Sequence, residues 1–168
     1  MVAPPPTHTG RSAVESDDLV DAVLGASRAL VAVAARSLAN VGEDVTLAQY
    51  RVLVVLASRG PQRLADLADA LTVDRSTATR MGDRLVRKRL VVRQRGTEDR
   101  RVVRISLTEA GAELVTEVSR RRRAEIRRIV RRMPPAGRAA VVDALQAFAA
   151  AAGEVPEQDW SLGWGHRA

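Results

Sequence analysis

Residues 73–107 read VDRSTATRMGDRLVRKRLVVRQRGTEDRRVVRISL, and this stretch decides the fold. Asp74 is suited to cap a helix, because its carboxylate can accept the unpaired N–H groups of the first turn. Three apolar residues then recur at helical spacing and share one buried face: Ala78, Met81 and Leu85. Further on, the period changes to that of two strands, 91–95 and 103–107. The stretch therefore predicts a helix followed by a β-hairpin.

Positive charge is concentrated in the same stretch. Residues 74–104 hold eleven cations: Arg75, Arg80, Arg84, Arg87, Lys88, Arg89, Arg93, Arg95, Arg100, Arg101 and Arg104. They hold four anions: Asp74, Asp83, Glu98 and Asp99. The difference is +7, the whole formal net charge of the chain. This concentration indicates a polyanionic partner; the plainer alternative is a solvated face of a stable helix.

Composition narrows the class of protein. The 168 residues suit one domain with an added helical layer, and only 2% are aromatic, which predicts an aliphatic core. A pI near 11.3 favours nucleic acid or an anionic membrane surface as partner. The absence of Cys excludes disulfides, thiolate catalysis and cysteine zinc sites. No apolar run has the length of a membrane span, so we expect a soluble, cytoplasmic protein.

Two shorter helices precede the cationic one. Thr46 and Gln49 form a T-x-x-Q capping box that opens a helix through residue 58, and a third helix is predicted at 63–71. Only two residues then separate it from the Asp74 cap. Helices joined by so tight a turn form a helix-turn-helix, whose second helix can enter the major groove of DNA. The hairpin is too short to be stable alone and is predicted to pack as a wing.

Long helices are predicted on both sides of this unit. The first begins at Ser16 or Asp17 and ends near residue 40–42, with an apolar stripe long enough to pack against another chain. Another runs from Thr108 to about residue 132, acidic in its first half and arginine-rich in its second, as the helix dipole favours. Pro134 and Pro135 break it and start a last helix.

The two ends of the chain are predicted to be tails. Residues 1–15, with the start MVAPPPTHTGR, predict a disordered segment, and residues 153–168 a C-terminal tail. Trp160 and Trp164 are costly to leave in water, so we expect that tail to dock on a protein surface; disorder is the alternative.

Residues 47–111 resemble the MarR family of winged-helix transcriptional regulators. The matching segments are LAQYRVLVVLASRGPQRLADLADAL, VDRSTATRMGDRLVRKRLVVR and DRRVVRISLTEAG. The resemblance implies a mainly α fold with a small β wing, in which 46–107 form the DNA-binding winged helix-turn-helix. The remainder of the protomer, 16–152, would supply dimerisation helices at 16–42 and 108–152.

The resemblance also implies site residues. Five residues sit where the helix at 74–87 meets the major groove: Arg75, Ser76, Thr77, Thr79 and Arg80. Arg101 sits where a wing arginine enters the minor groove, with Asp99 holding it. The resemblance implies a phosphate contact at Arg63, and we add three further cations to that set: Arg84, Arg87 and Arg89. Arg89 stands where the family usually has a glycine that closes this helix. A left-handed backbone conformation at that position would be strained for arginine. Either the helix ends differently or Arg89 is an extra phosphate contact.

The sequence therefore predicts a sequence-specific double-stranded DNA-binding regulator, a ligand-responsive repressor that acts as a homodimer on a palindromic operator. An effector of unknown identity is expected, with Tyr50 as a candidate contact. No cofactor, metal site or catalytic residue is expected, because the histidines, His8 and His166, both lie in the tails. Two alternatives stay open: a less specific chromosome-associated protein, and a membrane-surface helix at 108–132.

Overall fold

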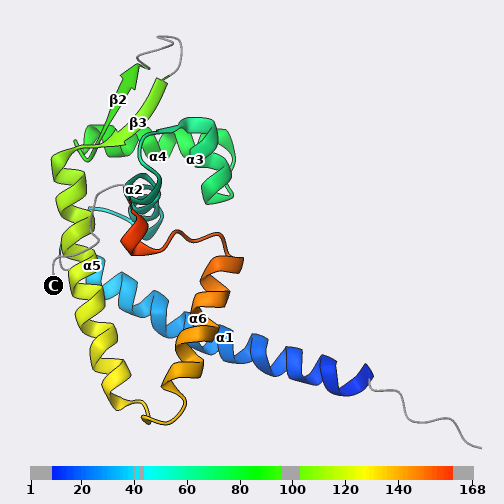
Figure 1. Cartoon of the computed structure of the whole chain (residues 1–168). Helices are drawn as coiled ribbons and strands as arrows, with labels where there is room; N and C mark the ends of the chain where they lie inside the picture. Colours follow the sequence, from blue (N-terminus) through cyan, green and yellow to red (C-terminus); the bar gives the residue numbers. More distant parts are fainter. Residues whose placement is uncertain (1–8, 40, 42–43, 96–102, 161–168) are drawn as a thin grey trace, which may run out of the picture.

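The computed structural model describes residues 9–39, 41, 44–95 and 103–160 (Figure 1). Its helices are α1 Thr9–Ala39, α2 Leu47–Arg59, α3 Leu64–Leu71, α4 Arg75–Arg87, α5 Glu109–Arg132, α6 Arg138–Ala151 and the 3-10 helix η1 Glu157–Asp159. Its strands are β1 Gln62–Arg63, β2 Val91–Arg95 and β3 Val103–Leu107. The predicted class, mainly α with a small β wing, is confirmed.

Helix α2 lies at the centre of the molecule, and apolar residues on nearly all its sides are buried. Its capping box is present, with Thr46 accepting from the Gln49 N–H at 3.2 Å. The largest fully buried side chains of the core are aliphatic: Leu53, Leu67, Leu85, Ile105, Val33, Val52, Val115 and Val118. The low aromatic content therefore gives the aliphatic core that composition predicted.

The sheet has the order β1-β3-β2, with both pairs antiparallel. The wing hairpin is made of the two predicted strands, and it pairs Val91 with Leu107 and Arg93 with Ile105. Strand β1 was not predicted, because two residues are too short to show an alternating pattern. It follows Gly60, whose φ of 74° turns the chain out of α2. Arg63, expected to start α3, instead lies in β1 and immediately precedes the helix.

Helix α1 begins at Thr9, so the predicted start at Ser16 or Asp17 is wrong and residues 9–15, assigned to the tail, are helical. Ser or Asp is favourable as the N-cap at which a helix begins, but such a residue does not prevent the helix from extending further towards the N-terminus. Figure 1 shows α1 projecting from the body as a long arm. Within residues 16–39, the buried side chains of α1 are confined to its C-terminal part, at Val33, Ser37 and Leu38, and this part packs on α5 and α2.

Helices α5 and α6 form an antiparallel extension below the winged unit (Figure 1). Thr108 caps α5 as predicted, accepting from the Gly111 N–H at 3.1 Å. The prolines do end α5, but α6 begins at Arg138, after a turn that Gly137 completes with a φ of 85°. The prediction that Pro134 and Pro135 start α6 therefore misses by a turn. No residue of α6 is buried in the protomer.

The C-terminal segment returns to the body after α6. Trp160 is half-buried, packs against the main core and donates its Nε1–H to the Val155 carbonyl at 2.9 Å. Arg51 pairs with Glu154, and Arg123 with Glu157, which fixes the segment to α2 and α5. Docking of the tail is thus confirmed for Trp160, whereas Trp164 lies outside the described residues. Among the helices of the described chain, none combines the length and apolar character of a membrane span.

Candidate nucleic-acid interface

The N-terminus of α4 is capped by Asp74, as predicted. Its Oδ1 accepts from the Thr77 N–H at 2.8 Å and from the Ser76 hydroxyl at 2.6 Å. Its Oδ2 accepts from the Thr77 hydroxyl at 2.7 Å. Hydrogen bonds from Ser76 and then Thr77 hold the pKa of the Asp74 carboxyl well below its usual range. The first turn of α4 is therefore tied together by one ionised side chain.

The two faces of α4 differ sharply. Its inner face buries Ala78, Gly82 and Leu85. A Cβ on Gly82 would meet Ile105 Cδ1 at 3.0 Å, so this glycine permits close packing of α4 on β3. Its outer face carries all five residues expected in the major groove and two expected at phosphates: Arg75, Ser76, Thr77, Thr79, Arg80, Arg84 and Arg87. The arginines and Ser76 are exposed, and the two threonines half-buried.

Hydrogen bonds within α4 order part of this face. Arg80 donates to the Thr77 hydroxyl oxygen at 3.0 Å, and the Thr79 hydroxyl donates to the Arg75 carbonyl at 2.8 Å. Both bonds hold side chains along the helix rather than away from it. The structure thus presents these residues on one surface, and their contact with bases stays a prediction.

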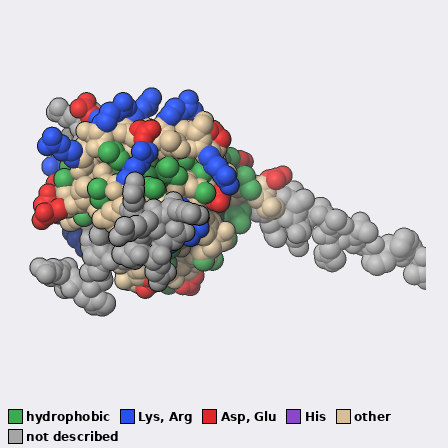
Figure 2. All heavy atoms as spheres, turned by 90° about the horizontal axis from the view of Figure 1, so that it is seen from above, with side chains coloured by type: hydrophobic (Ala, Val, Ile, Leu, Met, Phe, Trp, Pro, Cys, Tyr) green, Lys and Arg blue, Asp and Glu red, His purple; other side chains and the backbone are tan. Residues whose placement is uncertain are grey.

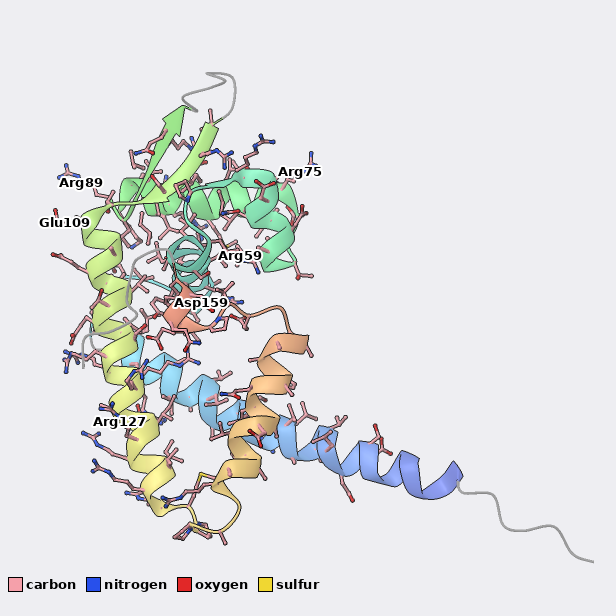
Figure 3. The ribbon with its side chains drawn as sticks, in the orientation of Figure 1. Arg59, Arg75, Arg89, Glu109, Arg127 and Asp159 are labelled. Carbon is pink, nitrogen blue, oxygen red and sulfur yellow. The ribbon has the colours of Figure 1, made fainter. Side chains whose placement is uncertain are left out.

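Helix α4 ends with an arginine in the left-handed conformation. Arg89 has a φ of 57°, its N–H is bonded to the Val86 carbonyl at 2.9 Å, and Leu90 N–H is bonded to the Leu85 carbonyl at 3.1 Å. The helix therefore ends as a glycine would end it, and the strain expected for arginine is present. Figure 3 shows Arg75 and Arg89 near opposite ends of α4, both pointing away from the body.

One of the eleven cations counted in this region, Arg104, was not assigned a DNA contact from the sequence. Arg104 on β3 lies directly opposite Arg63 on β1, and neither has a carboxylate partner within the described chain. Like charges at directly opposed positions destabilise a sheet in the absence of an anion. The alternation of β3 could have identified Arg104 as an outward position, but its neighbour on β1 was not predictable.

Figure 2 views this end of the molecule and shows Lys and Arg side chains spread over it, with fewer Asp and Glu side chains among them. Arg93 is paired with Asp83 there, which reduces its free charge. Asp99 and Arg101, the predicted wing contacts, lie outside the described residues.

A second feature lies far from α4, between α5 and the C-terminal segment. This α5 groove has a volume of about 680 Å³, and its lining includes Ser119, Arg122, Ile126, Arg127, Glu157 and Trp160. Tyr50 lies beneath it; burial raises the pKa of its phenol, although a hydrogen bond with Ser119 opposes that shift. The groove combines cationic, aliphatic and aromatic walls.

Comparison with known proteins agrees with this geometry. Residues 45–103 match the model of the MarR family. The HTH-type transcriptional repressor MdtR of Bacillus subtilis (strain 168) is 41% identical over 69 residues, which are 41% of this chain and 44% of MdtR. Across the curated relatives that it matches, the chain spans 44% to 64% of their length.

Solved structures extend the likeness to most of the chain. RV1404 from Mycobacterium tuberculosis is 45% identical with a TM-score of 0.79, over 84% of this chain and 96% of that one. BpsR of Bordetella bronchiseptica, whose DNA binding is regulated by 6-hydroxynicotinic acid, is 26% identical with a TM-score of 0.60, over 86% and 98%. By its winged helix-turn-helix, its family match and these relatives, the chain belongs to the MarR family.

Proposed function

We propose that this protein is a sequence-specific double-stranded DNA-binding transcriptional regulator that acts as a homodimer. The observation that carries the proposal is the outer face of α4, where the arginines and Ser76 are exposed, Thr77 and Thr79 are half-buried, and the first turn is ordered by Asp74. Guanidinium groups can bind guanine O6 and N7, and hydroxyls serve bases or phosphates. The MarR family consists of transcriptional regulators, which are not enzymes.

Each predicted site residue has a role in this proposal. Arg75, Ser76, Thr77, Thr79 and Arg80 meet base edges in the major groove. Phosphates are bound by Arg63, Arg84, Arg87 and Arg89, and Arg104 joins them because it stands beside Arg63. Arg101, oriented by Asp99, enters the minor groove.

The homodimer is supported by apolar surface that the protomer leaves exposed. Helix α1 exposes Leu19, Val20, Leu24, Leu30 and Val31, and α6 exposes Val141, Val142, Leu145 and Phe148. Such continuous stripes mark protein contacts more often than free surface. A two-fold dimer would set two α4 helices about 34 Å apart, on successive turns of the major groove of a palindromic operator.

The test begins with selection of bound DNA from a random duplex library. Anisotropy titrations then compare the selected duplex with a random one, and we expect an affinity ratio of at least about 1,000 at physiological salt. Arg80→Ala should weaken the selected duplex more than the random one. Arg84→Ala should weaken both and lower the salt slope by about 0.9, the effect of one lost phosphate contact.

Arg128→Ala is the matched control. Arg128 is an exposed arginine of α5, and no carboxylate pairs with it in the described part of the chain. A loss on Arg128→Ala equal to that on Arg80→Ala would favour the second candidate, a less specific chromosome-associated protein. The observation behind that candidate is a set of α5 arginines without a carboxylate partner among the described residues: Arg122, Arg127, Arg128, Arg131 and Arg132.

We further infer repression relieved by a small aromatic acid bound in the α5 groove. Arg122 and Arg127 can pair with a carboxylate there, and Trp160 offers a ring face. Repression is the activity named for MdtR, and an aromatic acid is the regulator named for BpsR. In thermal-shift assays, 6-hydroxynicotinic acid or a phenolic acid should stabilise the free protein more than the operator complex. Equal stabilisation of both forms would contradict this role, as would full stabilisation of Arg122→Ala.

A further inference from the structure

The hydroxyl protons of Ser76 and Thr77, at the start of α4, are already used in hydrogen bonds to Asp74. Ser76 Oγ donates to Asp74 Oδ1 at 2.6 Å, and Thr77 Oγ1 donates to Asp74 Oδ2 at 2.7 Å. A hydroxyl has a single proton, so neither side chain has a second one to give. An ionised carboxylate only accepts, so the direction of both bonds is fixed. The low pKa of Asp74 keeps that carboxylate ionised at neutral pH.

The hydroxyl oxygens of Ser76 and Thr77 can therefore only accept hydrogen bonds from a ligand. Ser76 is exposed and its oxygen keeps both acceptor positions. Thr77 has given one acceptor position to the Arg80 guanidinium at 3.0 Å and keeps the other. In the major groove the donors are the amino groups of adenine N6 and cytosine N4, while guanine and thymine oxygens accept.

We propose that Asp74 makes the Ser76 and Thr77 hydroxyls acceptor-only groups, so that these two residues select adenine or cytosine amino groups. Guanine is left to the arginines of the same helix. The inference rests on the proposed function, since it requires α4 to lie in the major groove. Asp74 is here a positioning residue, which acts on the bases only through the two hydroxyls.

Asp74→Asn tests this assignment with almost no change of shape. The amide oxygen must stay on the Oδ1 side, because the Thr77 N–H still needs an acceptor there. The amide nitrogen then takes the place of Oδ2 and donates to Thr77 Oγ1. The Thr77 proton is released to point outward, whereas the Ser76 proton remains held.

The variant should therefore change base choice and not only affinity. Selection from a random duplex library should return a half-site in which one position changes from adenine or cytosine to guanine or thymine. Ser76→Ala should relax selection at a different position. Asp69→Asn is the charge-matched control, an exposed carboxylate on α3 that caps nothing, and should return the wild-type half-site.

A chemical probe gives a second readout. At the selected position, purine in place of adenine, or 2-pyrimidinone in place of cytosine, removes the amino group alone. Wild-type affinity should fall at least about fivefold, as expected for one lost base contact, and the affinity of the corresponding hydroxyl variant should not change. Circular dichroism and thermal melting confirm that each variant is folded.

The outcomes separate the two proposals. If wild type selects a sequence but Asp74→Asn and Ser76→Ala return the same half-site, the acceptor-only assignment is overturned and the proposed function stands. If the wild-type protein enriches no sequence, the proposed function fails, and this inference with it.

Discussion

The backbone of Arg89, at the junction of α4 and β2, adopts a conformation that is unfavourable for a residue with a Cβ. Its φ of 57° lies in the left-handed region, where a Cβ costs on the order of 1 kcal/mol relative to glycine. Its carbonyl accepts from the Thr108 hydroxyl at 2.7 Å, which ties this junction to the start of α5. Since the backbone there favours glycine, we infer that arginine is present for its exposed guanidinium, the proposed phosphate contact.

Replacing this residue should improve the fold and weaken DNA binding. We expect Arg89→Gly to raise the free energy of unfolding by about 0.5–1 kcal/mol, measured by urea denaturation. Its affinity for DNA should fall, with a salt slope lower by about 0.9 in anisotropy titrations.

Arg89→Ala is the control that separates the two effects. It removes the guanidinium but keeps the Cβ, so it should lose the same phosphate contact without gaining stability. A less stable Arg89→Gly protein would show that the arginine side chain stabilises the fold, contrary to this interpretation.

At the scale of the element, α5 shows how charge order stabilises a helix. Glu117 accepts from Arg120 and from Arg121, each at 2.7 Å. The Arg120 hydrogen bonds first, and then that of Arg121, lower the pKa of Glu117 to about 2. A carboxyl whose pKa is lower in the folded than in the unfolded state stabilises the fold above its unfolded pKa.

This contribution should be lost as the pH falls from about 4.5 towards 2, the ordinary and shifted pKa values of Glu117. In Glu117→Gln we expect lower stability than wild type at neutral pH and convergence of the two proteins near pH 2, followed by urea denaturation at several pH values. The difference should be small, because the ion pairs are exposed.

Glu113→Gln serves as the matched control one turn earlier, since Glu113 has no arginine partner in the described chain. The difference in free energy of unfolding between Glu113→Gln and wild type should not show the pH dependence that is expected for Glu117→Gln. A Glu117→Gln protein that stays parallel to wild type from pH 6 to pH 2 would contradict the proposed origin of the stability.

The elements also show where sequence reasoning succeeds. Asp74, Thr46 and Thr108 cap helices as predicted, because a cap is a local contact within one turn. Strand β1 could not be predicted, because its two residues are extended only through pairing with β3, more than 40 positions away. The outer face of α4 was predictable from periodicity, but the bond from Arg80 to Thr77 was not, since it depends on a side-chain rotamer.

At the scale of the whole molecule, the exposed cationic surface and the exposed apolar surface lie in different parts of the protein. The cationic face of α4 and the wing occupies one end, whereas the exposed apolar residues of α1 and α6 lie towards the other (Figure 1). A helix that projects with leucines half exposed gains little stability from its own protomer. A second copy that covers α1 would stabilise it and hold two α4 helices at a fixed separation.

Leu24→Asp tests this arrangement, because Leu24 is 50% exposed in the middle of the α1 stripe. Light scattering should find wild type as a dimer and the variant as a monomer, since a carboxylate buried in an apolar interface is unpaired. Affinity for a duplex with two half-sites should fall by about 100-fold or more, while affinity for one half-site should be unchanged. Ala29→Asp introduces the same charge on α1, away from the stripe by helical period, and should stay dimeric. A monomeric wild-type protein at micromolar concentration would rule out the two-site mode of binding.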